Sequence, residues 1–491
     1  MGIIKKQSIQ STFYTYLGVG LGFLNSAILF PMLIDEEHLG MLYYLNSFTA
    51  IFAGLCSLGV PLIIIKLFPK LRDEKNSHSG FFSFVLLMTA IGILIGAIIY
   101  FSFGDWLISD KINDSNFHTF LIGFLILLVF RVASRNFDSY IRMLMNTVLG
   151  SFLENFLLKV VIFLALAVYW WIGGYDFVIL FYIYVLALAL PGIVSGAYVI
   201  LNGETNLRLK YFRLATKNMA KEIWSLAGFG LLASLGGIVV LEIDRIMIGN
   251  MIDLSDIAIY STSFFFGLFC SLPARGLKRI SSVVLAEAWE KDDLQIIKDV
   301  YHKSSLNLFL IGVYLFLGVW MNIDYVFSLL PEAYSAGKTV ILIIGIAQLF
   351  DLITGVNNEI ITTSKYYKYT TYFLSILIVV AIVSNYLLIP IYGIEGAAAA
   401  SFLSIVIFNL LKFIFLYRKL NYQPFNFKFL IIVLIGAFSY YGISTFLPVF
   451  ENIYVGILIT GSTLTIIYWI PVYFLKVSTD VNETIDKYIK K

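Results

Sequence analysis

Fourteen long apolar stretches separated by short polar gaps run along the 491-residue chain, and the gaps alternate in charge. Lys and Arg occupy every second gap, whereas the gaps between them carry Asp and Glu, with Lys111 as the one cation. Cytoplasmic loops of membrane proteins are enriched in Lys and Arg, and about 20 apolar residues suffice to cross a bilayer. The pattern therefore predicts an all-α polytopic membrane protein with fourteen transmembrane helices and both termini in the cytoplasm.

The composition limits what else the chain can contain. Charged residues make up 13% of the sequence, about half of what a soluble domain carries, so no large soluble domain is expected. The sequence has no Gly-rich phosphate loop followed by Lys and Ser or Thr. Its four histidines lack metal-ligand spacing. We therefore expect a protein that is not an enzyme, binds no metal or cofactor, and works between its helices.

A polar linker and two repeated motifs suggest an internal duplication. Residues 202–222 form a long basic linker after the sixth apolar stretch. YLGVGLGFLNS (residues 16–26) resembles SLAGFGLLAS (225–234), and CSLGVPLIIIK (56–66) resembles CSLPARGLK (270–278). Parallel repeats of this kind are one transporter plan. We predict a six-helix lobe (1–201), the linker, a second six-helix lobe (223–418), and two further helices with a cytoplasmic tail (419–491).

Cationic side chains in the fourth and fifth apolar stretches are the first candidates for a site. Arg131 and Arg135 lie one helical turn apart on one face. They either line the mouth of a cavity that attracts an anion or anchor the helix at the cytoplasmic surface. Lys159 falls near mid-membrane, where an ammonium group needs water or a partner. It either lines a cavity or is neutralised by Glu154.

Ionisable residues in the second half supply further candidates. In the seventh stretch, Glu242 and Arg245 are three residues apart and can pair, whereas Asp244 lies on another face and either couples an ion or braces a neighbouring helix. Arg275 is the first-choice phosphate ligand because guanidinium binds phosphate through a planar fork. The remaining candidates are Lys278 in the eighth stretch, and Asp351 and Glu359 in the tenth.

Two segments resemble a known family. IDRIMIGNMIDLSDIAIYS (residues 243–261) and NYLLIPIYGIEGAAAASFLS (385–404) look like segments of Wzx-type lipid-linked oligosaccharide flippases, which belong to the multidrug/oligosaccharidyl-lipid/polysaccharide exporter superfamily. The N-terminal segment from YLGVGLG to FPMLIDEEHLGMLYYLNSF is also similar. Together with the helix number, the resemblance covers nearly the whole chain.

The resemblance implies two six-helix bundles in a pseudo-twofold arrangement around a cavity, with two C-terminal helices added. It implies that an undecaprenyl-diphosphate-linked oligosaccharide repeat unit crosses the bacterial cytoplasmic (inner) membrane by alternating access, for O-antigen, capsule or exopolysaccharide synthesis. Partners would be membrane lipids and the polymerase and glycosyltransferases of the same pathway. A proton or sodium gradient would drive transport, with Asp244, Asp351 and Glu359 as coupling candidates. By helix number, the resemblance places these residues in the cavity: Asn25, Asn46, Lys66, Asp244, Arg275 and Lys278.

Two other functions remain open at this point. An ion-coupled multidrug or organic-cation antiporter would share the fold, although the many cations favour an anionic diphosphate as substrate. A membrane polysaccharide polymerase or ligase would be expected to carry a large outward loop with Arg and His. No such loop is present in the sequence.

Overall fold

The computed structural model describes residues 2–72, 80–107, 114–174, 176–202 and 217–489. Within these ranges the chain is helical and contains no strand. The predictions for the linker (residues 203–216) and for the outward gap around Lys111 (108–113) fall outside the described residues. The helices group into two compact units, Met1–Ala258 and Ile259–Lys491.

The N-terminal unit begins with two spans that are each interrupted. Span one is α1 (Gly2–Phe23), the π-helix η1 (Leu24–Leu29) and α2 (Phe30–Leu33), and span two is α3 (Glu36–Cys56) with α4 (Val60–Leu71). The other elements up to the end of the unit are α5 (Phe81–Leu107), α6 (Asp114–Met143), α7 (Val148–Gly150), the π-helix η3 (Ser151–Leu157), α8 (Leu158–Ile172), α9 (Phe177–Leu201), α10 (Lys217–Met251) and the first turns of α11 (Leu254–Leu268).

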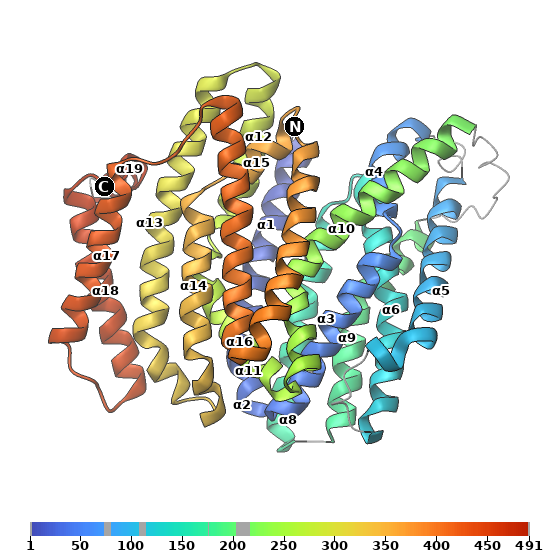
Figure 1. The fold of residues 1–491 in the computed structure, drawn as a ribbon, viewed down its shortest axis with the longest axis horizontal. Coiled ribbons are helices and arrows are strands. Elements are labelled where there is room, and N and C mark those ends of the chain that lie inside the picture. The colour runs from blue at the N-terminus through green and yellow to red at the C-terminus, as the bar shows by residue number, and fades with distance from the viewer. Residues whose placement is uncertain (1, 73–79, 108–113, 175, 203–216, 490–491) are drawn as a thin grey trace. The chain divides into compact units, whose positions relative to one another are not determined.

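The C-terminal unit continues from α11 through a short 3-10 turn into longer helices (Figure 1). Its elements are η5 (Phe269–Ser271), α12 (Ala274–Glu290), α13 (Leu294–Phe327), η6 (Glu332–Gly337), α14 (Lys338–Ile353), α15 (Asn357–Thr363), α16 (Lys368–Leu420), α17 (Phe427–Phe446), α18 (Ile453–Phe474) and α19 (Thr479–Ile489).

Helix number agrees with the sequence prediction once α16 is divided. Thirteen helices among the described residues are long and apolar enough to cross a membrane. One of them is α16, which has 53 residues and bends back on itself at Gly393 (φ 59°, ψ −136°). Counting its two legs separately turns thirteen into fourteen. The predicted polar gap at residues 390–392 is therefore a kink, which glycine permits because it has no Cβ.

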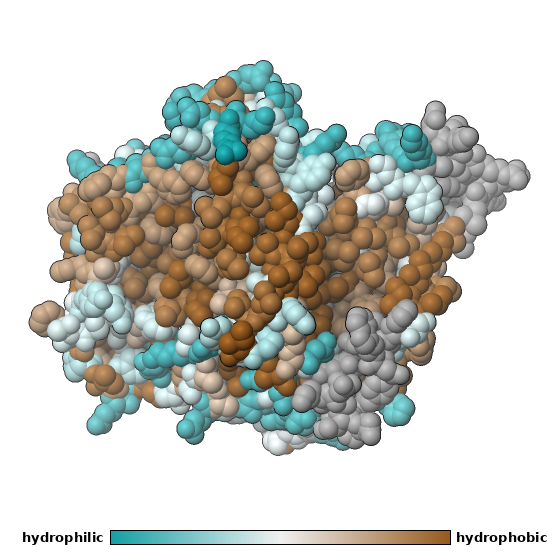
Figure 2. Space-filling view, in the orientation of Figure 1, coloured by the Kyte–Doolittle hydropathy of each residue, from teal (hydrophilic) through white to brown (hydrophobic). Residues whose placement is uncertain are grey.

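Apolar side chains cover the parts of these helices that would face lipid. In the C-terminal unit, the middle of the face drawn in Figure 2 is hydrophobic, and hydrophilic residues gather near the helix ends. Exposed large apolar side chains include Leu434, Phe438 and Leu458, which are 58%, 67% and 68% exposed. A soluble protein rarely exposes contiguous apolar area of this kind. The protein is therefore a multi-pass membrane protein.

The repeated Cys-Ser-Leu motif marks a helix break in both units. In the first, α3 ends at Cys56, and α4 begins after Gly59, whose φ is 67°. In the second, η5 contains Cys270, and α12 begins directly after Pro273. Proline favours the first turn of a helix, where its missing N–H costs nothing. The two spans predicted as continuous helices, the second and the eighth, are thus each broken at the same sequence signal.

Helix α10 packs against α3 and α4 within the N-terminal unit. Two hydrogen bonds join it to α3. Ser47 donates to Glu242 Oε2 at 2.6 Å, and Tyr44 donates to Asn250 Oδ1 at 2.8 Å. The sequence-based division assigned α10 from residue 223 onward to the second lobe and its first residues to the linker, and the lobe boundaries themselves stay a prediction.

Candidate functional site

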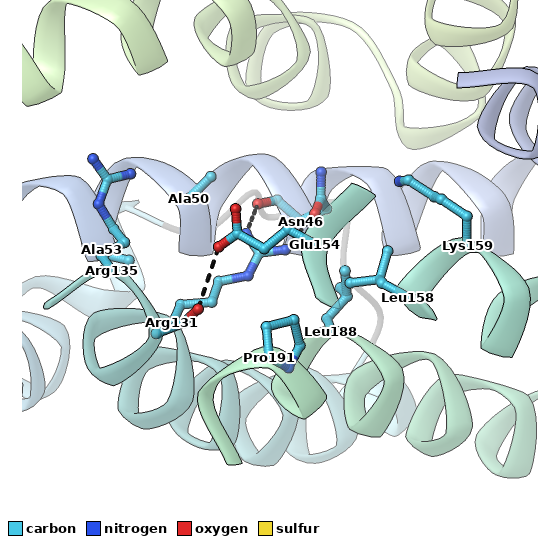
Figure 3. Close-up of a pocket in the computed structure, with 11 residues that line it drawn as sticks. Asn46, Ala50, Ala53, Arg131, Arg135, Glu154, Leu158, Lys159, Leu188 and Pro191 are labelled. Atoms are coloured by element: carbon cyan, nitrogen blue, oxygen red, sulfur yellow. Dashed lines mark hydrogen bonds between the residues drawn. The ribbon is translucent and has the colours of Figure 1, made fainter. Parts of the chain in front are cut away.

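A polar pocket of about 280 Å³ lies among α3, α6, η3, α8 and α9 of the N-terminal unit (Figure 3). Its walls combine three cations, one carboxylate and a few small or apolar side chains. The lining residues are Asn46, Ala50, Ala53, Arg131, Ser134, Arg135, Glu154, Leu158, Lys159, Leu188 and Pro191. The three cations and one carboxylate leave an excess of two positive formal charges, so the pocket suits an anion.

Arg131 is held in this pocket by two hydrogen bonds to Asn46. Its Nη1 donates to the main-chain oxygen of Asn46 at 2.8 Å, and its Nη2 donates to the side-chain oxygen of the same residue. A guanidinium group has further N–H donors beyond these two. Arg131 is therefore oriented by α3 while keeping donors for a ligand.

Arg135 and Lys159 lie toward opposite ends of the pocket, with Glu154 and Arg131 between them (Figure 3). Arg135 Nη2 donates to Ser234 Oγ of α10 at 2.6 Å. Ser134 Oγ donates to Glu154 Oε1 at 3.3 Å. No ion pair joins Lys159 to Glu154 in the described part of the chain, and both side chains line the pocket. The role of Lys159 in substrate binding stays a prediction.

The segment that carries Glu154 is held tightly against the first helix. A Cβ placed on Gly18 of α1 would lie 1.5 Å from the main-chain oxygen of Asn155 in η3. Asn25 in η1 is 1% exposed and donates from Nδ2 to the main-chain oxygen of Lys159 at 2.9 Å. Both contacts involve π-helical turns, which are rare and are frequent at functional sites. Asn25 thus braces the backbone that presents Lys159, and it does not itself line the pocket.

Two other candidates of the N-terminal unit lie away from the pocket lining. Lys66 is exposed on α4. Asp244 is 3% exposed within α10. On the same helix, Arg245 donates to Glu242 Oε2 at 2.7 Å, which confirms the pairing expected from their spacing.

Two candidates of the C-terminal unit, Lys278 and Asp351, belong to a second polar cluster. Lys278 of α12 pairs with Asp351 of α14, with Nζ and Oδ2 2.7 Å apart. Asn409 Nδ2 of α16 donates to the other carboxylate oxygen of Asp351 at 3.2 Å. Glu359 lies on α15, and its Oε2 is buried. Arg275 is exposed on α12, outside this cluster.

Sequence reasoning missed several residues that build these two sites. Ser134 lies one turn from Arg131, and Ser234 lies within an apolar repeat segment. A polar hydroxyl group in an otherwise apolar helix was the sequence feature that could have identified either serine as a site residue. Lys412 was noted among the polar residues of its apolar stretch but was not chosen as a site residue; it is 3% exposed in α16, and the charges of Lys278 and Asp351 act on it. A lysine inside an apolar stretch marks a costly buried charge.

Comparison with known proteins supports a transporter fold. The family model described as "Polysaccharide biosynthesis protein" matches residues 4–272, more than half of the chain, and the MatE model matches residues 231–387. The uncharacterized membrane protein MJ1068 of Methanocaldococcus jannaschii is 20% identical over 94% of both chains.

Two solved structures share the architecture. The lipid II flippase MurJ in an inward closed conformation superposes with a TM-score of 0.71 at 14% identity, over 96% of this chain and 99% of that one. An inward-facing multidrug resistance MATE family transporter of the MOP superfamily gives 0.58 at 12% identity, over 84% of this chain and 98% of that one. These likenesses confirm the predicted fold class. By the extent of its family match, the chain belongs to the polysaccharide biosynthesis protein family.

Proposed function

We propose that this protein is a flippase that moves undecaprenyl-diphosphate-linked oligosaccharide repeat units across the cytoplasmic membrane by alternating access. The observation that carries the proposal is the pocket of Arg131, Arg135 and Lys159 inside a helical membrane unit. A diphosphate cannot cross hydrocarbon unaided because its charge must stay solvated or paired. The three cations of the pocket would supply that pairing, while the prenyl chain stays in lipid.

The size of the pocket favours recognition of the diphosphate rather than of the whole glycan. A volume of about 280 Å³ is slightly below the roughly 300–1,000 Å³ of typical small-molecule sites. Guanidinium groups bind phosphate oxygens through parallel N–H donors. Arg131 and Arg135 would hold the phosphates, Lys159 would add a mobile charge, and Glu154 would limit the affinity so that the substrate can leave.

The membrane orientation and the pathway that we propose follow from the distribution of Lys and Arg along the chain and from the family match. Lys and Arg gather in the gaps taken as cytoplasmic, so both termini lie in the cytoplasm and substrate enters from that side. Glycosyltransferases would supply the lipid-linked unit, and a polymerase would use it after transfer, in O-antigen, capsule or exopolysaccharide synthesis.

Reconstituted vesicles provide the test. Purified protein would be incorporated into proteoliposomes that contain a fluorescent lipid-diphosphate-oligosaccharide, and its appearance in the other leaflet would be followed with a sugar-modifying enzyme. The proposal expects protein-dependent transfer and no gradient-driven uptake of an organic cation such as ethidium. Ethidium transport without transfer of the lipid-linked sugar would instead identify a drug antiporter of the same fold.

A further inference from the structure

Another pocket, of about 650 Å³, lies within the C-terminal unit. Its walls come from the end of α13, the start of α14, the end of α17, the first turns of α18 and the loop between α17 and α18. These parts gather at one end of the unit, the lower end in Figure 1. They adjoin the acidic gaps that predict the outward side of the membrane. The pocket has the size of typical small-molecule sites, which span roughly 300–1,000 Å³.

The lining combines one tryptophan, two tyrosines, two carboxylates and one lysine. These residues are Trp320, Tyr325, Tyr440, Asp324, Glu451 and Lys338. The formal charge of the lining is therefore −1, opposite in sign to that of the pocket in the N-terminal unit. Trp and Tyr are enriched where the membrane meets water. The pocket thus suits a ligand that carries a cation and lies at this interface.

Lys338 already shows how an ammonium group fits this pocket. Its Nζ lies 2.5 Å from Asp324 Oδ1 and 5.7 Å from the centre of the Trp320 ring, and an ammonium group is attracted to an indole face. The side chains of Lys338 and Asp324 are 42% and 75% exposed, and exposed ion pairs contribute little to stability. A ligand that offers a phosphate to Lys338 and an ammonium group to Asp324 can therefore replace this pair at little cost.

Glu451 supplies a second carboxylate for the cation of a ligand. It is exposed, and among the described residues it has no ion-pair partner. The loop that carries it is held on α13, because the Phe450 N–H donates to the Tyr325 hydroxyl oxygen at 3.0 Å. A Cβ placed on Gly456 of α18 would lie 2.5 Å from Cζ of the same tyrosine. Tyr325 therefore keeps the loop, and with it Glu451, at the wall of the pocket.

Apolar surface continues from the pocket along the chain. Val449 lines the pocket and is largely exposed, and Phe446 and Tyr454 on either side of the loop are also exposed. A small soluble zwitterion would leave these side chains bare. A lipid would cover them with its acyl chains while its headgroup lies among the polar groups, so the surface favours a lipid as the occupant.

We propose that this pocket binds the headgroup of a zwitterionic lipid that carries a phosphate and a primary amine, of the phosphatidylethanolamine type. Lys338 donates to the phosphate, and Asp324 and Glu451 accept from the ammonium group beside Trp320. An anionic lipid such as phosphatidylglycerol is disfavoured, because it brings a phosphate to a negative lining and no cation. The bound lipid joins α13 and α14 to α17 and α18. The inference does not depend on what the protein transports.

Native mass spectrometry of the purified full chain tests the headgroup preference. Delipidated protein in detergent would be titrated with phosphatidylethanolamine, phosphatidylcholine or phosphatidylglycerol of identical acyl chains. Phosphatidylethanolamine should bind roughly tenfold more tightly than phosphatidylglycerol, because charge-assisted hydrogen bonds are strong. Phosphatidylcholine should fall between them, since methylation removes the N–H donors and keeps the cation. Equal binding of the ethanolamine and glycerol lipids would overturn the proposal.

A double variant reverses the charge of the pocket. Asp324→Asn/Glu451→Gln changes the formal charge of the lining from −1 to +1, so it should lose the preference for phosphatidylethanolamine and bind phosphatidylglycerol more tightly than wild type does. A misfolded protein would not gain such binding. Glu332→Gln is the matched control, since Glu332 is an exposed carboxylate of η6 outside this lining. An unchanged preference in the double variant, or the same change in the control, would contradict the proposal.

A free disaccharide tests the other kind of ligand that aromatic rings and carboxylates can bind. Lactose in excess should not displace phosphatidylethanolamine from the wild-type protein. Displacement by lactose that is lost in Trp320→Leu would assign the pocket to a glycan and overturn the proposal.

Discussion

Arg131 on α6 donates two hydrogen bonds to Asn46 on α3, one to its main-chain oxygen and one to its side-chain oxygen. The paired contacts fix the plane of the guanidinium group against a second helix. A preorganised group loses less conformational freedom when a ligand binds. The pocket is therefore built around an arginine that is already in position for an anion.

Glu154→Gln should tighten substrate binding and slow release. The carboxylate lies in the pocket with three cations, so its loss raises the formal excess of positive charge from two to three. We expect a lower apparent KM for the lipid-linked substrate together with a lower maximal rate, measured in proteoliposomes over a range of substrate densities. A raised KM would mean that Glu154 contacts the substrate favourably.

The two single variants of the Lys278–Asp351 pair should differ in how much they lower the stability of the protein. Asp351→Asn removes the carboxylate whose charge acts on both Lys278 and Lys412, whereas Lys278→Met leaves Asp351 under the influence of the Lys412 charge. Asp351→Asn should therefore lower the melting temperature more. Breaking a buried pair costs about 3–5 kcal/mol, and partial exposure reduces this here.

The double variant Lys278→Met/Asp351→Asn completes the cycle. It should be more stable than Asp351→Asn alone, because it removes one of the two uncompensated ammonium groups. Additive losses in the double variant would show that the two side chains are not energetically coupled.

Gly18→Ala should disrupt the N-terminal unit, and Gly20→Ala should not. A Cβ on Gly18 would lie 1.5 Å from the Asn155 main-chain oxygen, but a Cβ on Gly20 has no neighbour within 4 Å. Overpacking typically costs about 1–3 kcal/mol, and backbone cannot move aside as a side chain can. Yield of monodisperse protein and melting temperature would be compared. Equal behaviour of the two variants would contradict the close packing of α1 on η3.

Asp35 predicts an acid-dependent contribution to stability. It caps α3 by accepting from the His38 N–H at 3.0 Å, and its other oxygen contacts His38 Nδ1 at 2.6 Å. Burial acts to raise the pKa of Asp35, but the bonds and charge of His38 outweigh it and lower the pKa below its usual value. The contribution is therefore present above the ordinary aspartate pKa of about 4 and is lost as the pH falls through the lowered folded-state value.

Asp35→Asn removes the charge of the side chain but keeps its capping hydrogen bond to α3, because asparagine caps helices about as well as aspartate. Near neutral pH its melting temperature should stay within a few degrees of wild type. On the acid side it should fall less steeply. A wild-type slope in the variant would show that the Asp35 charge does not contribute.

The helix number and several local features could be predicted because they depend on sequence period and charge. The lengths of the apolar stretches predicted the membrane spans, and the three-residue spacing of Glu242 and Arg245 predicted their ion pair. The gap predicted before Gly393 separates two legs of α16, because the φ and ψ of Gly393 are not helical. The close packing of the two legs could not be predicted: a Cβ on Gly396 would lie 2.2 Å from the Leu388 main-chain oxygen.

The grouping of the candidate residues could not be predicted, because it depends on how each helix is rotated about its axis. Arg131, Arg135, Lys159 and Asn46 meet in one pocket, whereas Asn25 turns to the backbone of Lys159. Lys278 and Asp351 are 73 residues apart in sequence, and no local pattern links them. The π-helical turns η1 and η3 shift the facing of Asn25 and Glu154 relative to a regular helix, so a periodic count misplaces both.

The most direct test of the central claim is the rate of transfer of a diphosphate-linked oligosaccharide in proteoliposomes that contain Arg131→Ala. Lys70→Ala is the control, since Lys70 is exposed and makes a surface pair with Glu222, which contributes little. Loss of a charged hydrogen bond costs about 1.5–3 kcal/mol, so transfer by Arg131→Ala should fall at least tenfold while Lys70→Ala transfers at the wild-type rate. Wild-type transfer by a folded Arg131→Ala protein would contradict the account.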